Sequence, residues 1–226
     1  MKIGIIIAMD IEFQRMVEIL GGDVRGRVGE NEVVLCHSGI GKVNAALGTM
    51  EFILKEHPDC ILSTGLAGGL DADLRVRDII LASETCYHDV WCGEGNELGQ
   101  VQGLPARYAA NETLLQTGMR LKEMEQYSSR LKKGLLCTGD QFITNREKQR
   151  GIKDLFPAAL AVDMESAAIA QTCYKANVPF LSIRIISDTP GFTDDHQQQW
   201  QDFLAGLCHS SFQFIRLFLA GLPSQI

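Results

Sequence analysis

The sequence predicts the α/β class: a single-domain, three-layer α/β/α sandwich with a mixed, largely parallel central sheet. Near-continuous apolar runs of strand length alternate with segments of helical period, which is typical of a sheet covered by helices on both faces. No repeat, low-complexity tract or linker divides the 226 residues, and a composition of 46% hydrophobic and 22% charged residues is ordinary for a soluble globular protein. We therefore expect one domain over residues 1–226.

Strands are predicted from the apolar runs, and helices mainly from apolar residues at three- and four-residue steps. The expected strands, in chain order, are Ile3–Ala8, Glu32–His37, Cys60–Ser63, Arg77–Ser83, Gly134–Cys137, Ala159–Val162 and Phe180–Ile186. The expected helices are Asp10–Leu20, Gly41–Lys55, Asn111–Met124, Asn145–Leu155, Met164–Tyr174 and Asp194–Leu219. Boundary residues support three of them: Gly21-Gly22 ends the first helix, Pro58 follows the second, and Asn111 is placed as an N-cap.

Carboxylates follow several of these strands. Glu12 comes after the first strand, Asp163-Met164-Glu165 after the sixth, and Ser187-Asp188 after the last. In α/β sheets, ligands bind beyond the carboxyl ends of the strands. Because a buried carboxylate is costly unless it is paired or hydrogen-bonded, these positions favour a ligand site over a purely structural role.

Two glycine-rich segments, Ser38–Gly41 and Gly65–Gly69, have two interpretations that the residues alone leave open. They form tight strand-to-helix turns, or they bring the backbone close to a ligand. Ser38–Gly41 is not the start of a phosphate-binding P-loop, because Gly39-Ile40-Gly41-Lys42 lacks the four-residue gap and the Ser or Thr after the lysine.

Composition argues against several classes of function. A net charge of −7 leaves no basic excess for binding nucleic acid. The seven cysteines are odd in number and irregularly spaced, which favours reduced thiols in a cytoplasmic protein. Cys86, His88 and Cys92 match no common zinc spacing and lack a fourth ligand, so we expect no metal. The apolar run Ile3–Ala8 is too short for a signal peptide or a membrane span.

A series of residue blocks, in order along nearly the whole chain, carries a resemblance to a known family. The blocks are Met1–Glu12, Ser38–Val43, Thr64–Leu70, Tyr87–Asp89, Gly139–Ile143, Val162–Glu165 and Arg184–Asp188. With these blocks the chain resembles the 5′-methylthioadenosine/S-adenosylhomocysteine nucleosidases of the purine/uridine phosphorylase superfamily. The resemblance implies a nucleoside phosphorylase-like fold and hydrolysis of the N-glycosidic bond, with release of adenine and the 5-thio-ribose product. It further implies no cofactor and a homodimer with each site near the subunit interface.

The resemblance also implies roles for the reacting groups. Asp188 would protonate N7 of adenine, and Ser187 would help to hold it. Glu12 would orient and deprotonate the attacking water, with Arg184 near the water and the carboxylates, while Gly68 belongs to the substrate-binding set. Cleavage produces an oxocarbenium-like sugar and a purine that leaves badly unless it is protonated. An acid on one side and a base on the other are therefore needed, as in inverting glycosidases.

The remaining implied residues bind the substrate. Glu165 would accept hydrogen bonds from the ribose 2′- and 3′-hydroxyls, and Met164 would pack under the sugar. Phe142 would stack on the purine, and the backbone of Ile143 would read its Watson–Crick edge. Trp200 would close over the 5′-alkylthio group.

Three positions depart from the pattern of the family. Leu66 stands where these enzymes usually have a small hydroxyl residue near the attacking water, Asp163 replaces the more usual Glu, and Trp91–Glu97 differs. A leucine side chain cannot hydrogen-bond the water, so its positioning must depend on Glu12 and Arg184. A binding protein that retains the pocket without turnover is therefore one alternative.

Two further alternatives are enzymes of the same fold. A purine nucleoside phosphorylase would need arginines around the early glycine-rich turn to bind phosphate, whereas after the first strand this chain has Glu12 and only Arg15 on the following helix. A nucleosidase for aminofutalosine or AMP is the other. AMP calls for a cationic 5′ pocket, whereas Trp200 and Phe203 predict an apolar one.

Overall fold

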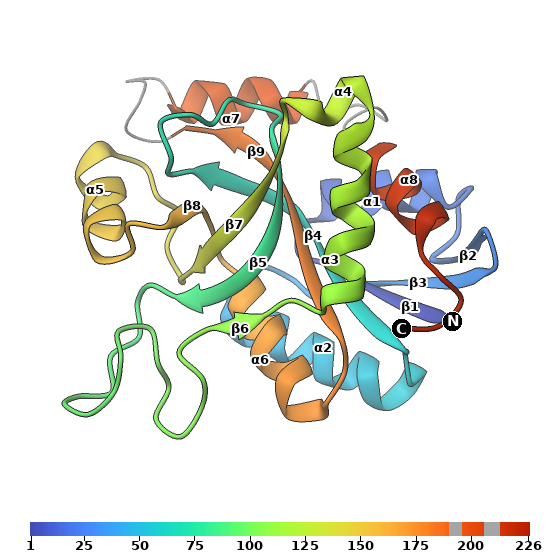
Figure 1. Ribbon diagram of the computed structural model, residues 1–226, viewed down its shortest axis with the longest axis horizontal. Coiled ribbons are helices and arrows are strands. Elements are labelled where there is room, and N and C mark those ends of the chain that lie inside the picture. Colours follow the sequence, from blue (N-terminus) through green and yellow to red (C-terminus); the bar gives the residue numbers. More distant parts are fainter. Residues whose placement is uncertain (190–195, 206–212) are drawn as a thin grey trace.

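The protein is built on one mixed, twisted sheet (Figure 1). The computed structural model describes residues 1–189, 196–205 and 213–226. Eight strands follow one path across the sheet: β2 (Arg25–Val28), β3 (Asn31–His37), β1 (Lys2–Ile7), β4 (Cys60–Gly69), β8 (Ala159–Asp163), β7 (Leu131–Thr138), β5 (Ile79–Tyr87) and β6 (Tyr108–Ala109). The ninth, β9 (Phe180–Asp188), pairs with β4 and with β5.

Part of the sheet closes on itself, which the sequence did not predict. β4 pairs in parallel with β9 along most of its length and in antiparallel fashion with β8 at Gly68 and Gly69. β8 then pairs with β7, β7 with β5, and β5 with β9, so these five strands form a closed ring. Ala67, Ala161 and Ile186 pack together inside it.

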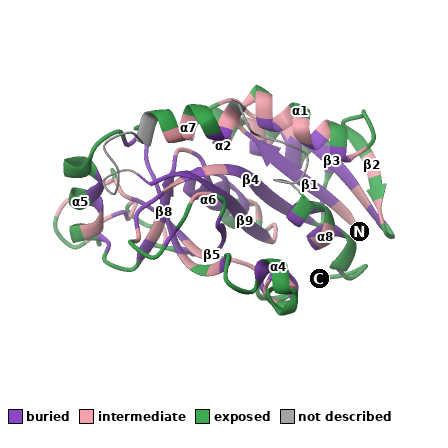
Figure 2. Cartoon of the chain, turned by 90° about the horizontal axis from the view of Figure 1, so that it is seen from above, coloured by how far each residue is buried: buried purple, intermediate pink, exposed green. Residues whose placement is uncertain are grey.

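Helices cover both faces of the sheet, as the sequence predicts. The first layer contains α1 (Asp10–Ile19), α3 (Glu112–Arg120) and α8 (Gln213–Gly221), and the second contains α2 (Lys42–Glu56) and α6 (Ser166–Ala176). Alternation along β1 separates the two cores, because Ile5 packs with the first layer and Ile6 with the second. Figure 2 shows the buried strands in the middle and exposed residues on the outer sides of the helices.

The remaining described helices lie at the ends of the sheet (Figure 1). They are α4 (Glu125–Ser128), which follows a 3-10 turn at Leu121–Glu123, α5 (Arg146–Leu155) and α7 (His196–Ala205). The predicted helix over 194–219 corresponds in the described residues to α7 and α8, while 206–212 lie outside them. None of the helices in the described ranges is long and apolar enough to cross a membrane.

Several predicted boundaries differ from the structure. β4 is longer than expected and includes the glycine-rich segment 65–69, because its N–H and C=O groups pair with β9 and β8. The helix expected from Met164 begins at Ser166, with Glu165 as its N-cap. The helix expected to reach Met124 ends at Arg120. The predicted cap is confirmed, since the Asn111 side chain accepts a hydrogen bond from the Leu114 N–H.

Candidate active site

A cavity of about 280 Å³ lies where β1, β4, β8 and β9 end. All ten residues that the sequence singled out line this cavity: Glu12, Gly68, Phe142, Ile143, Met164, Glu165, Arg184, Ser187, Asp188 and Trp200. Sequence reasoning missed Met9 and Ile40, which also line it. A single apolar residue after a strand carries no signal that separates a cavity wall from core packing.

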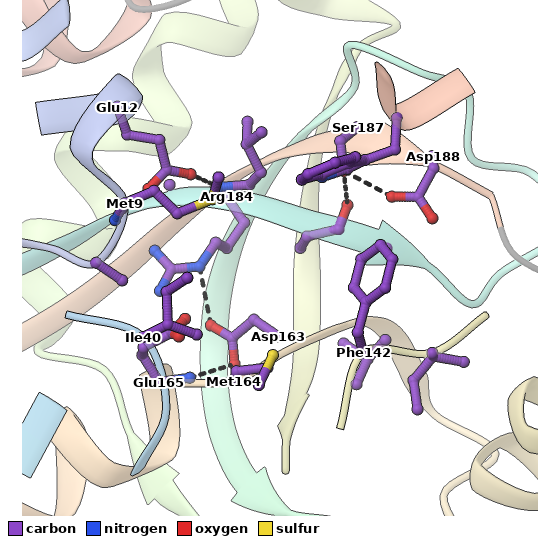
Figure 3. A pocket seen from close by; sticks show the side chains of 18 of the residues that line it. Met9, Glu12, Ile40, Phe142, Asp163, Met164, Glu165, Arg184, Ser187 and Asp188 are labelled. Carbon is purple, nitrogen blue, oxygen red and sulfur yellow. Dashed lines mark hydrogen bonds and ion pairs between the residues drawn. The ribbon is translucent and has the colours of Figure 1, made fainter. Parts of the chain in front are cut away.

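The carboxylates occupy different ends of the cavity (Figure 3). Asp188 and Ser187 lie at one end, above the ring of Phe142 in this view. Glu12 lies at the other end, with Arg184 between it and the lower group that contains Glu165. A ligand in the cavity therefore meets one carboxylate at each end.

Asp188 is the last residue of β9 and is almost fully buried. Ser187 Oγ donates a hydrogen bond to Asp188 Oδ1 at 2.6 Å and lies 3.3 Å from the carbonyl oxygen of Ala67. The register of β9 against β4 shifts here, so that Ser187 is an additional residue opposite the step from Ala67 to Gly68. Such a bulge redirects the side chains that follow it, and it places Gly68 opposite Asp188.

Glu12 lies in the first turn of α1 and is held by backbone N–H groups. Its Oε1 accepts from Leu66 N at 2.8 Å and its Oε2 accepts from Met9 N at 3.3 Å. Burial raises the pKa of Glu12 to about 7, against the opposing effects of the Arg184 charge and the two N–H donors. A Cβ at Gly65 would lie 3.0 Å from Glu12 Oε1, so only glycine leaves this carboxylate in place.

Glu165 is held by the turn after β3. Its Oε1 accepts a hydrogen bond from Gly41 N at 2.9 Å, which connects the start of α6 to the start of α2. Gly41 has a φ of +93°, a conformation that side chains rarely adopt, so glycine is required for this contact. The glycine-rich segment 38–41 therefore holds a cavity carboxylate as well as forming a turn. Burial and the nearby charge of Asp163 raise the pKa of Glu165.

A buried ion pair forms the floor between Glu12 and Glu165. Arg184 Nε lies 2.8 Å from Asp163 Oδ2, and both side chains are almost inaccessible to solvent. The other end of the guanidinium donates to Ser63 Oγ at 2.8 Å. Such a buried pair is stable only when hydrogen bonds satisfy its remaining polar atoms, which is the case for both partners here.

Aromatic side chains form the wall beside Asp188. Phe142 and Trp200 pack edge to face, with ring centroids 5.6 Å apart and an angle of 60° between the planes. Ile143 is buried next to Phe142. This wall presents apolar surface and π faces to the cavity, which suits a flat heteroaromatic ring.

Three loops at the rim are joined through Lys42. Its Nζ lies 2.8 Å from both carboxylate oxygens of Asp89, and its backbone N donates to Asp140 Oδ1 at 2.8 Å. The N–H of Asp140 in turn donates to Asp89 Oδ2 at 3.0 Å. The loops after β3, β5 and β7 are thereby fixed to one another, with Gly41 and Phe142 next to the junction.

No metal site is formed by the described part of the chain, where no group of three or more His, Cys, Asp or Glu side chains could hold an ion. The six cysteines within the described ranges are free thiols. Cys86 and Cys137, on neighbouring strands, have sulfur atoms 3.6 Å apart.

Comparison with known proteins assigns this chain to a family. A family profile described as the phosphorylase superfamily matches residues 2–220. The chain belongs to the phosphorylase superfamily. A 5′-methylthioadenosine/S-adenosylhomocysteine nucleosidase of Staphylococcus epidermidis is 38% identical to it over 198 residues, which are 87% of this chain and 85% of the relative.

Two solved structures of superfamily members superpose on the whole chain. The methylthioadenosine/S-adenosylhomocysteine nucleosidase of Colwellia psychrerythraea, in complex with adenine, has a TM-score of 0.89 and 36% identity, and the match covers 100% of this chain and 97% of that one. The nucleosidase of Neisseria meningitidis, in complex with methylthio-immucillin-A, has a TM-score of 0.87 and 32% identity, covering 98% and 99%. The family resemblance and the fold class predicted from the sequence are confirmed.

Proposed function

We propose that this superfamily member hydrolyses the N-glycosidic bond of 5′-methylthioadenosine and S-adenosylhomocysteine, releasing adenine and the 5-thio-ribose product. One observation carries the proposal: buried carboxylates lie at opposite ends of a cavity whose described aromatic wall stands beside Asp188. A bound adenine nucleoside then has its base beside Asp188 and its sugar between Glu12 and Glu165. The names of the relatives agree with this substrate class.

The reaction requires one proton to be donated to the purine and one to be removed from the attacking water. Asp188 donates a proton to N7 of the purine as the bond from N9 to C1′ breaks, and the bonding electrons remain on the base. Water attacks C1′ from the other side and transfers a proton to Glu12. With a pKa of about 7, Glu12 is ionised in a substantial fraction of molecules at neutral pH, as a general base must be.

Sugar and base are positioned by residues that surround the two reacting carboxylates. Glu165 accepts hydrogen bonds from the ribose hydroxyls. Met164, beside it on the cavity wall, packs under the sugar. A thioether gives dispersion contact to a positively charged sugar without forming a bond to it. Phe142 stacks on the purine, and the backbone of Ile143 reads its edge.

Leu66 contributes through its backbone. Its N–H holds Glu12 at 2.8 Å, and its side chain packs against the core shared with α1, α3 and α8. The Leu66 backbone thus holds Glu12, the group on which the positioning of the attacking water depends, and this supports turnover over a role in binding alone.

Phosphate is disfavoured as the nucleophile. Glu12 and Glu165 flank the place where it would bind, and the Arg184 charge is already matched by Asp163 at 2.8 Å. Among the described residues that line the cavity, a phosphate dianion would meet carboxylates and only one cation, the paired Arg184, so water is the nucleophile that this geometry supports.

We infer that the protein acts in the cytoplasm on a small molecule, and not on nucleic acid or a membrane. We also infer that it forms a homodimer. The homodimer is supported by an exposed apolar face on α2, where Val43, Leu47 and Leu54 are 68%, 59% and 66% exposed. Ile40, which is 50% exposed, belongs both to this face and to the cavity wall. A second copy on this face would cover the apolar side chains and lie against the rim of the cavity.

A panel of nucleosides tests the proposed substrate class. Methylthioadenosine, adenosylhomocysteine, aminofutalosine, adenosine and AMP are incubated with the enzyme, and free adenine is measured by chromatography. Release from the two thioethers at least about tenfold faster than from AMP is expected, because Met9, Ile40 and Trp200 give the cavity apolar walls. Preferential release from AMP would contradict the apolar 5′ site, and binding without any release would identify a binding protein.

A further inference from the structure

We infer that Asp163 is a positioning residue, whose charge orients Arg184 and the first turn of α6 and thereby sets the reactivity of Glu12 and Glu165. This inference rests on the proposed function. Asp163 is the last residue of β8 and touches the cavity wall, yet its carboxylate points into the protein toward Arg184 (Figure 3).

Both carboxylate oxygens are occupied by protein donors. Oδ1 accepts from Thr138 Oγ1 at 2.6 Å, and Oδ2 accepts from Arg184 Nε at 2.8 Å and from Ser166 Oγ at 2.5 Å. Ser166 N adds contacts of 3.3 Å and 3.2 Å to the two oxygens. A carboxylate that accepts this many hydrogen bonds from the protein is fixed in one orientation, with its oxygens directed at protein donors.

The contacts of Asp163 join three elements that each carry a site residue. Thr138 ends β7, and its Oγ1 also accepts from the Ala167 N–H at 2.9 Å, so it fixes the start of α6 a second time. Ser166 is the first residue of α6, directly after Glu165. Arg184 lies on β9, four residues before Asp188. Movement of Asp163 would therefore displace the ribose-binding carboxylate and the guanidinium together.

The charge of Asp163 also acts on the base. It raises the pKa of Glu12 and that of Glu165, while Arg184 lowers both. These four groups are the charged neighbours that face one another across the floor, and His88 is a more distant partner of Asp163. Loss of the Asp163 charge leaves the Arg184 charge uncompensated, so the carboxylates lose their protons at lower pH.

The test compares Asp163→Asn with Thr138→Val. The first removes the charge at nearly constant shape, and the second loosens the same junction while the charge stays. For Asp163→Asn we expect kcat/KM with methylthioadenosine to fall roughly 10- to 100-fold. The acidic limb of its pH profile should move to lower pH, because Glu12 ionises more readily. Thr138→Val should lose less activity and keep the limb of the unmodified enzyme.

Several results would overturn the inference. An unshifted limb in Asp163→Asn, or the same shift in Thr138→Val, would leave Asp163 with a structural role only. If Asp163→Asn does not fold, Asp163→Ser carries the same test, and failure of both neutral variants to fold has the same meaning. Adenine release by the unmodified enzyme is measured first, since its absence would refute the proposed function and not the role of Asp163.

Discussion

Asp188 and Glu12 reach the cavity from opposite ends, and short hydrogen bonds from the protein hold each of them in place. Ser187 Oγ binds Asp188 at 2.6 Å, and the Leu66 N–H binds Glu12 at 2.8 Å. The two side chains come from the last strand and the first helix, so only folding brings them together. The catalytic division of labour is therefore a property of single residues that can be tested one at a time.

The acid is tested by Asp188→Asn. The amide keeps an acceptor for Ser187 but has no proton to give to the purine, so adenine release should fall roughly 10²- to 10⁴-fold. Binding of adenine, measured by calorimetry, should change only severalfold. Ser187→Ala is the matched control, and it should lose much less activity. Near-native turnover in Asp188→Asn would mean that another group is the acid.

The raised pKa of Glu12, the proposed base, should be visible in the pH dependence of the stability of the protein. Glu12 has a pKa of about 7 in the folded protein against 4.5 as the ordinary value, so the folded state holds this proton more tightly. The corresponding stabilisation is complete below about pH 4.5 and is lost as the pH rises through about 7, at a cost on the order of 3 kcal/mol.

Glu12→Gln should remove that part of the pH dependence as well as most of the activity. The melting temperature of the unmodified protein should fall between pH 5 and pH 8 by several degrees more than that of Glu12→Gln. Glu18→Gln, an exposed position on the same helix, serves as the control and should follow the unmodified protein. Equal falls in Glu12→Gln and the unmodified protein would refute the raised pKa.

At the scale of elements, the site depends on loops that are fixed at the rim by Lys42. Lys42→Met removes the ammonium group between Asp89 and Asp140 but keeps the backbone hydrogen bonds at this junction, so the loops after β5 and β7 should be held less firmly. The side chains of the Lys42–Asp89 ion pair are each about one-fifth exposed, so the effect on substrate binding should be modest, about 0.5–1 kcal/mol. We expect KM to rise roughly two- to fivefold at nearly constant kcat.

Lys55→Met is the matched control for this element, because Lys55 is exposed in the last turn of the same helix. It should leave KM unchanged. A fall in kcat with constant KM in Lys42→Met would show that the rim acts on the chemical step and not on binding.

The elements themselves were largely predictable, and the exceptions share a physical reason. Apolar runs and caps such as Asn111 are local signals, so most of the helices and the seven longer strands followed from the sequence, namely β1, β3, β4, β5, β7, β8 and β9. The closed ring did not, because it depends on the antiparallel pairing of β5 with β9 between residues far apart in the chain. β2 and β6 are short edge strands without a continuous apolar run.

The candidate site shows the same division. Its carboxylates were visible as polar residues at strand ends, and the family resemblance supplied Phe142 and Trp200. The partners of Asp163 were visible only in part: the resemblance placed Arg184 near the carboxylates, whereas Thr138 and Ser166 look like ordinary core or turn positions. The part of the site that binds substrate is thus easier to predict than the part that positions it.

For the whole molecule, the exposed face of α2 predicts association. Leu47→Glu places a charge in the middle of the apolar face, and sedimentation should show a monomer for this variant and, as proposed, a dimer for the unmodified protein. Leu155→Glu is the control, since Leu155 is 58% exposed on α5, away from this face. A Leu47→Glu variant with the mass of the unmodified dimer would exclude α2 from the interface.

The second product of the reaction identifies the nucleophile. Methylthioadenosine is incubated with the enzyme in phosphate-free buffer and in buffer with inorganic phosphate, and both products are identified by mass spectrometry. A hydrolytic site with Glu12 as base should release adenine and free 5-methylthioribose at the same rate in both buffers. Adenine release that requires phosphate, with methylthioribose 1-phosphate as the second product, would contradict it.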